Sequence, residues 1–273
     1  PKHHQGQSQS QNRTHHRLRQ LLAGNLRPIP SGAKRVIAAV RRLGYAIVKE
    51  AFMYDFDTIL LNRRSVRGYL PEALDHALIE EVFTLAAHAP SNCNVQPWQV
   101  HVASGNALRT LGRALTEAAQ QGQAPEPDVA MINRYQGDFR KRQIDAARAL
   151  YGAMGITRDD HAGRTRAFLR NLDAFGAPHA AFLFLPEGFA LREAADLGGY
   201  AQTLMLSMAS RGIASCAQGA LSLYPEIVRD HLKLAPGPRL IMGIAFGIED
   251  PDHPANAART GRAPLADLVR FHD

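Results

Sequence analysis

The sequence has few cysteines and no long apolar run. Its 273 residues include two cysteines, Cys93 and Cys216, which excludes a disulfide framework and favours a reducing compartment. The sequence contains no run of the ~20 apolar residues that span a membrane, and residues 1–20 lack the apolar stretch of a secretory signal. We therefore expect a cytoplasmic protein in which both cysteines are small, buried side chains.

Signatures of several other chemistries are also missing. The sequence shows no Ser-His-Asp set, no phosphate-binding loop and no G-x-G-x-x-G fingerprint of a dinucleotide-binding fold. Two histidine pairs, His3/His4 and His15/His16, lack the acidic or cysteine partners of a metal site. No bound metal is therefore predicted.

Acidic residues are scarce at the start of the chain. Residues 1–50 contain ten Lys or Arg and one acid, a net charge of +9, whereas the remainder holds 22 basic and 24 acidic side chains, a net charge of −2. The polar composition of residues 1–30 predicts a disordered start, and the apolar spacing of residues 33–50 predicts an amphipathic helix. We treat residues 1–50 as a basic extension and residues 51–273 as the folded domain.

A basic extension of this kind is compatible with binding to nucleic acid or to an anionic membrane. It has no aromatic residue before Tyr45, whereas binding to single strands favours interleaved aromatic side chains. We therefore predict a solvated tail, and we expect neither nucleic acid nor membrane as a partner.

The folded domain alternates between helical and strand periodicity. Helices are predicted at 57–62, 74–89, 108–121, within 136–175, at 192–211 and at 225–232. Strands are predicted at 99–103, 180–185, 213–216 and 239–246. In the helix over 74–89, the residues expected to face inward are Leu78, Ile79, Val82, Leu85 and Ala86. This alternation indicates an α+β or α/β fold, and it leaves the strand order open.

Three separated segments concentrate arginines or amides. RRSVR at 63–67 offers three guanidiniums and a hydroxyl, which suit two-point contact with a phosphate. APSNCNVQPW at 89–98 gathers amide groups, which suit the edge of a ring bearing both N–H and C=O groups. RTGRAP at 259–264 adds two further arginines. Taken singly, the first segment is explained equally well as an exposed basic turn, and the third carries little weight.

In this order, the segments resemble the FMN-dependent nitroreductase family. The resemblance runs from about Phe56 to the C-terminus, and its motifs are RRSVRGY (63–69), APSNCNVQPW (89–98), FGAPHAAFLFL (175–185), and CAQGAL (216–221) with RAPL (262–265). It implies an α+β sandwich in which helices flank a central, mainly antiparallel sheet. It also implies an intertwined homodimer with FMN at the subunit interface and a C-terminal extension that embraces the partner.

The resemblance also implies a set of cofactor contacts. Arg63, Arg64, Ser65 and Arg67 match the phosphate and ribityl side, with Arg67 near the flavin pyrimidine, and Arg262 matches a second phosphate clamp. A loop that crosses the cofactor from the partner chain matches Pro90, Ser91, Asn92, Asn94 and Gln96. The backbone N–H groups of Gln218 and Gly219 match the place that faces flavin N5. Family members often carry an acid before that glycine, and this chain has Gln218 there, which keeps the backbone donor and removes the charge.

The activity that the resemblance implies is hydride transfer from NAD(P)H to flavin N5 and then to a nitroaromatic or quinone acceptor in the same pocket. Such a ping-pong scheme needs no catalytic side chain. Tyr135, Phe139 and Tyr151 are candidates for contact with a small aromatic substrate, although core packing explains each of them equally well. Reductive dehalogenation, enone reduction or oxidative use of O2 on the same fold remain open alternatives.

Overall fold

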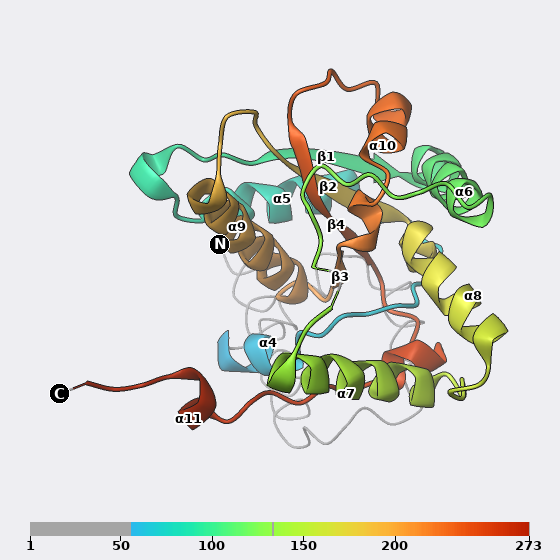
Figure 1. Ribbon diagram of the computed structural model, residues 1–273. Helices are drawn as coiled ribbons and strands as arrows, with labels where there is room; N and C mark the ends of the chain where they lie inside the picture. Colours follow the sequence, from blue (N-terminus) through green and yellow to red (C-terminus); the bar gives the residue numbers. More distant parts are fainter. Residues whose placement is uncertain (1–55, 133, 273) are drawn as a thin grey trace, which may run out of the picture. The chain divides into compact units, whose positions relative to one another are not determined.

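A four-stranded antiparallel sheet lies at the centre of the folded domain (Figure 1). The computed structural model describes residues 56–132 and 134–272, so the predicted basic extension and its helix over 33–50 lie outside the described residues. The strands are β1 (Gln99–Ser104), β2 (His179–Leu185), β3 (Ala214–Gln218) and β4 (Arg239–Gly247). Their order is β1-β2-β4-β3, and every pairing is antiparallel.

Helices make up most of the remaining described chain. The α-helices are α4 (Phe56–Asn62), α5 (His76–Ala86), α6 (Gly105–Gln120), α7 (Gly137–Ala153), α8 (His161–Leu172), α9 (Leu191–Ala209), α10 (Pro225–Leu232) and α11 (Leu265–Leu268). The short 3-10 helices are η1 (Asn92–Asn94), η2 (Ala174–Gly176), η3 (Ala220–Ser222) and η4 (Pro254–Ala257). Together with the sheet, they form the α+β architecture that the sequence predicted.

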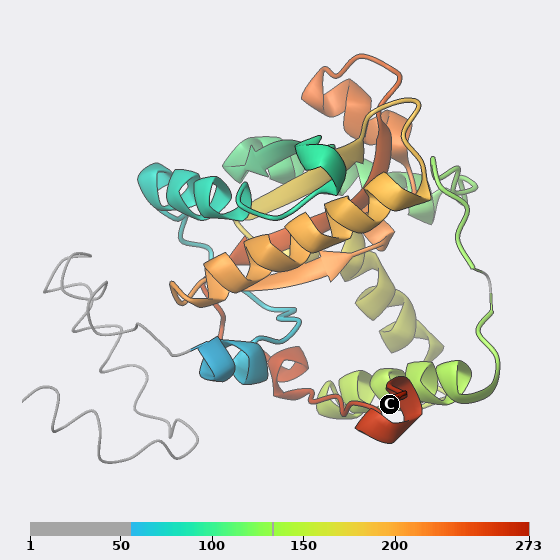
Figure 2. The same ribbon diagram turned by 90° about the vertical axis from the view of Figure 1, so that its left-hand side faces the viewer.

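Strand β2 is buried along its whole length because apolar layers cover both faces of the sheet. Phe182 and Phe184 join a core cluster with side chains of α6 and α10, whereas Leu183 joins a second cluster with side chains of α5 and α9. Figure 2 shows α5 and α9 together on one side of the sheet. Successive side chains of a strand point to opposite faces, so a strand covered on both sides needs an uninterrupted apolar run.

Specific residues fix the helix ends. The Asp75 carboxylate accepts a hydrogen bond from the Ala77 N–H (3.1 Å) at the start of α5, and Glu193 accepts one from the Ala190 N–H (2.9 Å) at the start of α9. Pro225 opens α10, where its missing N–H costs nothing. Gly212, at φ 70°, follows the last turn of α9.

The predicted elements are present, with a few corrections. Helix α5 is shorter than the predicted range over 74–89, and Leu85 is 39% exposed because it lies beside the buried stripe of Leu78, Val82 and Ala86. Cys216 is buried as predicted, but the prediction for Cys93 is wrong, since it is exposed at the tip of η1. The tail after β4 contains two short helices, η4 and α11, which the sequence did not predict.

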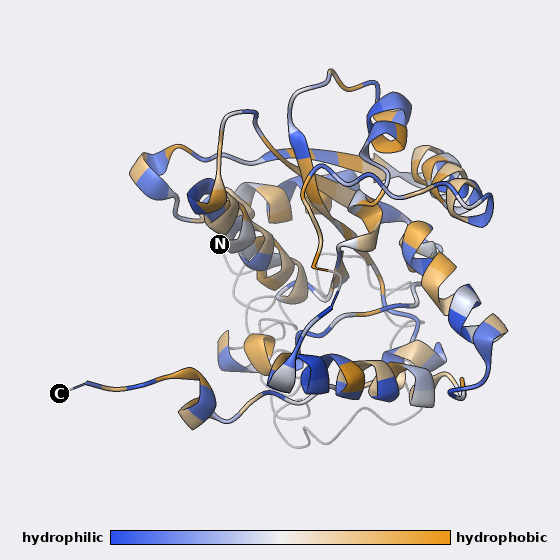
Figure 3. Cartoon of the chain, in the orientation of Figure 1, coloured by the Kyte–Doolittle hydropathy of each residue, from blue (hydrophilic) through white to orange (hydrophobic). Residues whose placement is uncertain are grey.

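Several apolar side chains at the edge of the domain remain exposed. Figure 3 shows apolar positions on α4 and α11, and these two helices contain no buried residue. Leu61 is 85% exposed and Leu265 is 63% exposed. Within residues 56–132 and 134–272, no helix combines the length and the hydropathy needed to cross a membrane.

Candidate functional site

The segment after α4 runs beside β3. Ser65 forms a parallel bridge with Ser215, and the Val66 N–H donates a hydrogen bond to the Ser215 carbonyl (3.1 Å). Extended chain alternates its side chains, so Arg63, Ser65 and Arg67 share one side and the buried Val66 faces the core. The electrostatic neighbours of the Cys216 thiol agree with this placement, since they are Arg67, Ser65 and Arg63.

The guanidiniums of Arg63 and Arg262 are close enough to interact electrostatically. The pKa of Arg63 is lowered first by burial and then by the positive charge of Arg262. Because Arg262 belongs to the C-terminal tail, this part of the tail lies near the segment after α4. No hydrogen bond or ion pair holds the Arg63 guanidinium within the part of the chain that the structure describes. Two neighbouring cations without a carboxylate between them form a site for an anion such as a phosphate.

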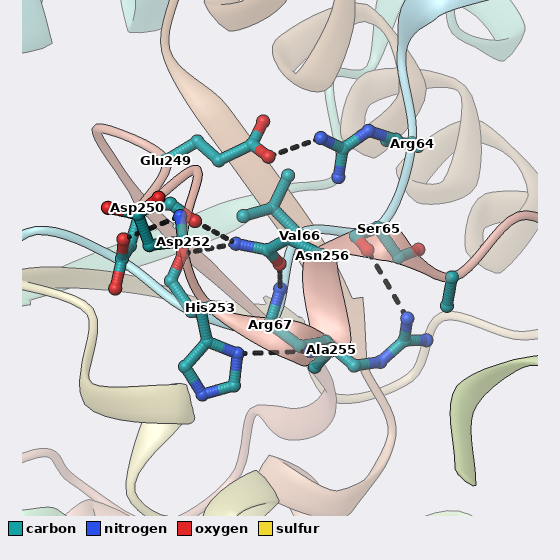
Figure 4. A network of polar contacts seen from close by, with 12 residues as sticks. Arg64, Ser65, Val66, Arg67, Glu249, Asp250, Asp252, His253, Ala255 and Asn256 are labelled. Atoms are coloured by element: carbon teal, nitrogen blue, oxygen red, sulfur yellow. Dashed lines mark hydrogen bonds and ion pairs between the residues drawn. The ribbon is translucent and has the colours of Figure 1, made fainter. Parts of the chain in front are cut away.

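The other arginines of these segments are more firmly engaged. Arg64 forms an ion pair with Glu249 through Nη2, while its Nη1 is buried without a partner among the described residues (Figure 4). The Arg67 guanidinium donates to the Ser65 carbonyl (3.2 Å) and lies 5.9 Å from the ring centroid of Phe175. Arg259 donates to the backbone carbonyls of Asn256 (2.7 Å) and Ala258 (2.9 Å).

Asn256, which the sequence did not single out, ties the tail to the same segment. Its Oδ1 accepts from the Arg67 N–H (2.7 Å), and its Nδ2 donates to the carbonyls of Gly68 and Asp250 (2.8 Å each), as Figure 4 shows in part. Asn256 is 4% exposed, so these bonds are shielded from water. A lone asparagine in a polar tail gives no sequence signal for this function, because its partners lie 188 and 189 positions away.

Gln218 and Gly219 stand at the end of β3. Gln218 is 4% exposed, and its Nε2 donates to the Asn171 carbonyl at the end of α8 (2.9 Å), while its Oε1 is buried with no partner in the described chain. Gly219 is exposed, and the atom nearest to the position of a Cβ there is Met131 Cε, at 3.8 Å. The predicted N5 position is thus adjacent to open space and to one apolar side chain.

The loop over 89–98 is backbone-strained and polar. Cys93, Asn94 and Gln96 have positive φ values of 50°, 57° and 48°, a conformation that non-glycine residues adopt at a cost. Ser91 Oγ accepts from the Gln96 N–H (2.9 Å), and the Asn92 N–H donates to Asp196 in α9 (3.0 Å). The side chains from Asn92 to Gln96 are exposed, so their amides are available to a ligand or to another chain.

This loop does not meet the arginine pair within one chain. Its anchor, Asp196, lies near the start of α9, whereas Arg63 precedes the bridge to β3, which follows the end of α9. The helix rises ~1.5 Å per residue, so the thirteen positions from Asp196 to Ala209 span roughly 20 Å. Figures 1 and 2 both show η1 and α4 toward opposite ends of α9.

The predicted substrate contacts are dispersed. Tyr135 is 43% exposed and Phe139 is 67% exposed, so core packing does not explain them. Tyr151 is partly buried, and the Arg164 guanidinium lies 5.5 Å from its ring centroid. Phe139 and Tyr151 lie near opposite ends of α7, about 18 Å apart along a helix that rises ~1.5 Å per residue, so one small ring cannot contact both side chains of a single subunit.

The donor set fits FMN in charge and chemistry. Arg63, which has no partner among the described residues, and the neighbouring Arg262 offer charged donors to a phosphate. Arg64 lies on the opposite side of the extended segment, where it pairs with Glu249 and its Nη1 is buried. A separate hollow of about 640 Å³ is lined by α6 and by Asp173, Gly176 and Ala177; it shares no residue with these segments. Burial also raises the pKa of the Cys216 thiol, with Arg67 opposing the shift, so the thiol beside the site stays protonated.

Residues 60–248 match the family model described as the Nitroreductase family. The nitroreductase NfnB of Mycolicibacterium smegmatis is 40% identical over 215 residues, which cover 79% of this chain and 92% of that protein. A 4-nitrobenzoate reductase of Pseudomonas putida is 32% identical over 217 residues, covering 80% of this chain and 95% of its own.

Solved structures show the same likeness. The FMN-dependent nitroreductase NfnB from Mycobacterium smegmatis, in complex with NADPH, superposes with a TM-score of 0.76 at 39% identity, covering 80% of this chain and 97% of its own. An FMN- and NADPH-dependent NfnB from Sphigopyxis sp. strain HMH gives a TM-score of 0.78 at 32% identity, covering 81% and 100%. The chain therefore resembles these two nitroreductases in both fold and sequence.

Proposed function

The chain belongs to the nitroreductase family, and from that premise we propose that it is an FMN-dependent oxidoreductase that reduces nitroaromatic acceptors with NAD(P)H. The observation that carries the proposal is the Arg63–Arg262 pair, two neighbouring cations that lack a carboxylate partner within the described residues. Relatives support the acceptor class, since the Pseudomonas putida enzyme is a 4-nitrobenzoate reductase. The Mycobacterium smegmatis enzyme was solved with NADPH, which supports the nicotinamide as electron donor.

Arg63 and Arg262 are the proposed phosphate clamp. Arg64 is proposed to support the clamp indirectly, by holding the segment after α4 to Glu249. Ser65 and Arg67 are the proposed contacts further along the cofactor, because they lie on the same side of the extended segment as Arg63. The Arg67 guanidinium is held by the Ser65 carbonyl, so its positive charge is fixed in place where it would stabilise negative charge on a reduced ring.

Gln218 and Gly219 are the proposed backbone donors toward flavin N5. The buried Gln218 amide, bonded to the Asn171 carbonyl, fixes the end of β3 and with it the position of Gly219. Bound FMN would supply the redox chemistry itself, carrying two electrons as hydride from the nicotinamide to the nitro group, which takes up a further proton from solvent and loses one oxygen as water. The chain's own groups bind, orient and supply charge, and none of them needs to exchange a proton or form a covalent bond.

The proposed active form is a homodimer in which the loop over 89–98 reaches the partner's cofactor. The separation of Asn94 from Arg63 along α9 supports this arrangement, because a single chain does not bring the two segments to one ligand. Exposed apolar residues on α4 and α11 offer surface for the contact. Residues 51–273 are the proposed catalytic domain, and residues 1–50 are an extension outside it.

An absorbance spectrum of the purified protein tests the proposal. We expect a yellow protein whose flavin band is bleached by NADPH or NADH under anaerobic conditions and restored by 4-nitrobenzoate. Parallel assays with a halophenol and an enone separate nitro reduction from other uses of the fold. A colourless protein that FMN cannot reconstitute would overturn the proposal, as would a flavin that no nicotinamide reduces.

A further inference from the structure

An apolar segment lies beside the proposed N5 position. Residues 128–132, here called the Met131 segment, have no regular secondary structure and contain three exposed apolar side chains. Val129 is 42% exposed, Met131 is 50% exposed and Ile132 is 70% exposed. These exposed apolar side chains do not belong to the core. Exposed apolar groups that lie together often mark a binding site, so the neighbours of this segment are informative.

The Met131 segment is firmly anchored at its start. Asp128 Oδ2 accepts a charge-assisted bond from Arg229 Nη2 (2.5 Å) and another hydrogen bond from the Leu240 N–H at the start of β4 (2.6 Å). Arg229 is 6% exposed, and it also donates to Glu226 (2.8 Å) and to the Pro238 carbonyl (2.9 Å). Several hydrogen bonds around this buried ion pair hold Asp128 in one geometry.

Three positions beyond this anchor, Met131 extends over the end of β3. Its Cε is the nearest atom to the position of a Cβ on Gly219, at 3.8 Å. Gly219 itself is exposed, so Met131 forms an edge of the open space there and leaves the rest uncovered. A methionine side chain has a flexible, polarisable thioether that adapts to aromatic faces and edges.

We propose that Met131 limits the size of the acceptor that can approach the proposed N5 position, and that the Asp128–Arg229 pair is the positioning element that holds it there. This inference rests on the proposed function. Met131 is a specificity-determining residue on this account, since it touches the acceptor and leaves the flavin contacts unchanged. The class of acceptor that it favours is a flat, single-ring nitroarene.

The test compares kcat/KM for nitrobenzene and for the larger 1-nitropyrene, with NADPH as donor, in the FMN-loaded enzyme. Met131→Ala should raise the ratio of 1-nitropyrene to nitrobenzene about tenfold, in the range by which one removed group changes discrimination in an apolar pocket. Met131→Leu, which keeps the volume, should leave the ratio within about twofold. Ile132→Ala is the matched control, a more exposed apolar residue on the same segment.

Asp128→Asn tests the anchor. Asp128→Asn should raise the ratio of kcat/KM for 1-nitropyrene to kcat/KM for nitrobenzene, as Met131→Ala does, and KM should change more than kcat. The FMN content should stay at the wild-type level. Because this variant also leaves Arg229 with one carboxylate partner fewer, the Met131 variants decide the outcome if it folds poorly. An unchanged ratio in Met131→Ala, with FMN bound and bleached by NADPH, would overturn this inference and leave the proposed function standing. Absence of FMN in the wild type would instead overturn the proposed function.

Discussion

At the scale of single residues, charge placement decides what the site can hold. Arg64, Arg67 and Arg259 each have an acceptor within the chain, whereas Arg63 has none among the described residues and lies near Arg262. Like charges that remain close and unneutralised are costly unless an anion joins them. Local sequence could not separate these arginines, because Glu249, the partner of Arg64, lies 185 positions away.

Removing either guanidinium of the Arg63–Arg262 pair should release the cofactor. Arg63→Ala and Arg262→Ala should each weaken FMN binding about 10- to 100-fold, because a hydrogen bond to a charged group contributes about 1.5–3 kcal/mol. Isothermal titration of the apoprotein with FMN measures the change. Arg259→Ala, on the same tail, is the control and should bind FMN within about twofold of the wild type. Unchanged FMN affinity in both variants would show that the clamp is wrongly assigned.

A buried histidine should make stability depend on pH. His179 is 3% exposed; its Nε2 accepts from the Leu74 N–H (2.9 Å), and its Nδ1 bonds Ser104 Oγ (2.7 Å). Desolvation lowers its pKa. The unfolded state therefore binds more protons below about pH 6.5, so this contribution to stability is present above that pH and is lost as the pH falls.

The unfolding temperature should decrease as the pH is lowered from 7 to 5. His179→Gln, whose amide can keep the bond to Leu74, should show a shallower fall even if its stability at pH 7 is lower. Calorimetry over this pH range measures both slopes. His101 and His253 also have lowered pKa values, so some slope should remain. Equal slopes in wild type and variant would contradict this explanation.

At the scale of elements, close packing positions the end of β3. Gly243 in β4 pairs with Gln218 in β3, and a Cβ at Gly243 would lie 2.4 Å from Leu221 Cδ1 and 2.7 Å from Leu221 Cβ. Leu221 belongs to η3, which begins directly after Gly219. A glycine in β4 therefore lets η3 lie flat on the sheet and sets the position of Gly219.

Gly243→Ala should destabilise the fold by about 1–3 kcal/mol, the usual cost of overpacking a tight contact. It should also slow flavin reduction by NADPH, because η3 must move and Gly219 moves with it. Urea unfolding and stopped-flow absorbance measure the two effects. Gly152→Ala, in α7 with no atom near its Cβ position, should instead leave stability unchanged or raise it by up to about 1 kcal/mol. Full stability in Gly243→Ala would contradict the packing argument.

The elements themselves could be predicted from the sequence, because each depends on local periodicity. The run AAFLFL over 180–185 predicted a buried strand, which β2 confirms with one residue more, and Pro225 predicted the start of α10, as found. The exposure of Leu85 could not be predicted, since it depends on how α5 lies against α9. For the same reason, the contacts made by Asn256, Asp128 and Met131 with distant parts of the chain gave no local signal.

At the scale of the whole molecule, one chain holds two separated halves of the proposed site. The arginine pair lies beyond the end of α9, and the amide loop lies near its start. A homodimer with twofold symmetry would bring the loop of one subunit to the arginines of the other and would build two equal sites. The proposed function thus requires each site to be shared between two subunits.

The FMN content of a mixed dimer tests that claim most directly. One subunit would carry Arg63→Ala and the other Asn94→Gly, a change that removes the amide without opposing the φ of 57°; Cys93→Gly on the same loop is the control. Both variant homodimers should lose FMN. If each site combines two subunits, the mixed dimer keeps one intact site and should retain about half of the wild-type FMN. A mixed dimer with no more FMN than either variant homodimer, or an Asn94→Gly homodimer with full FMN, would contradict the account.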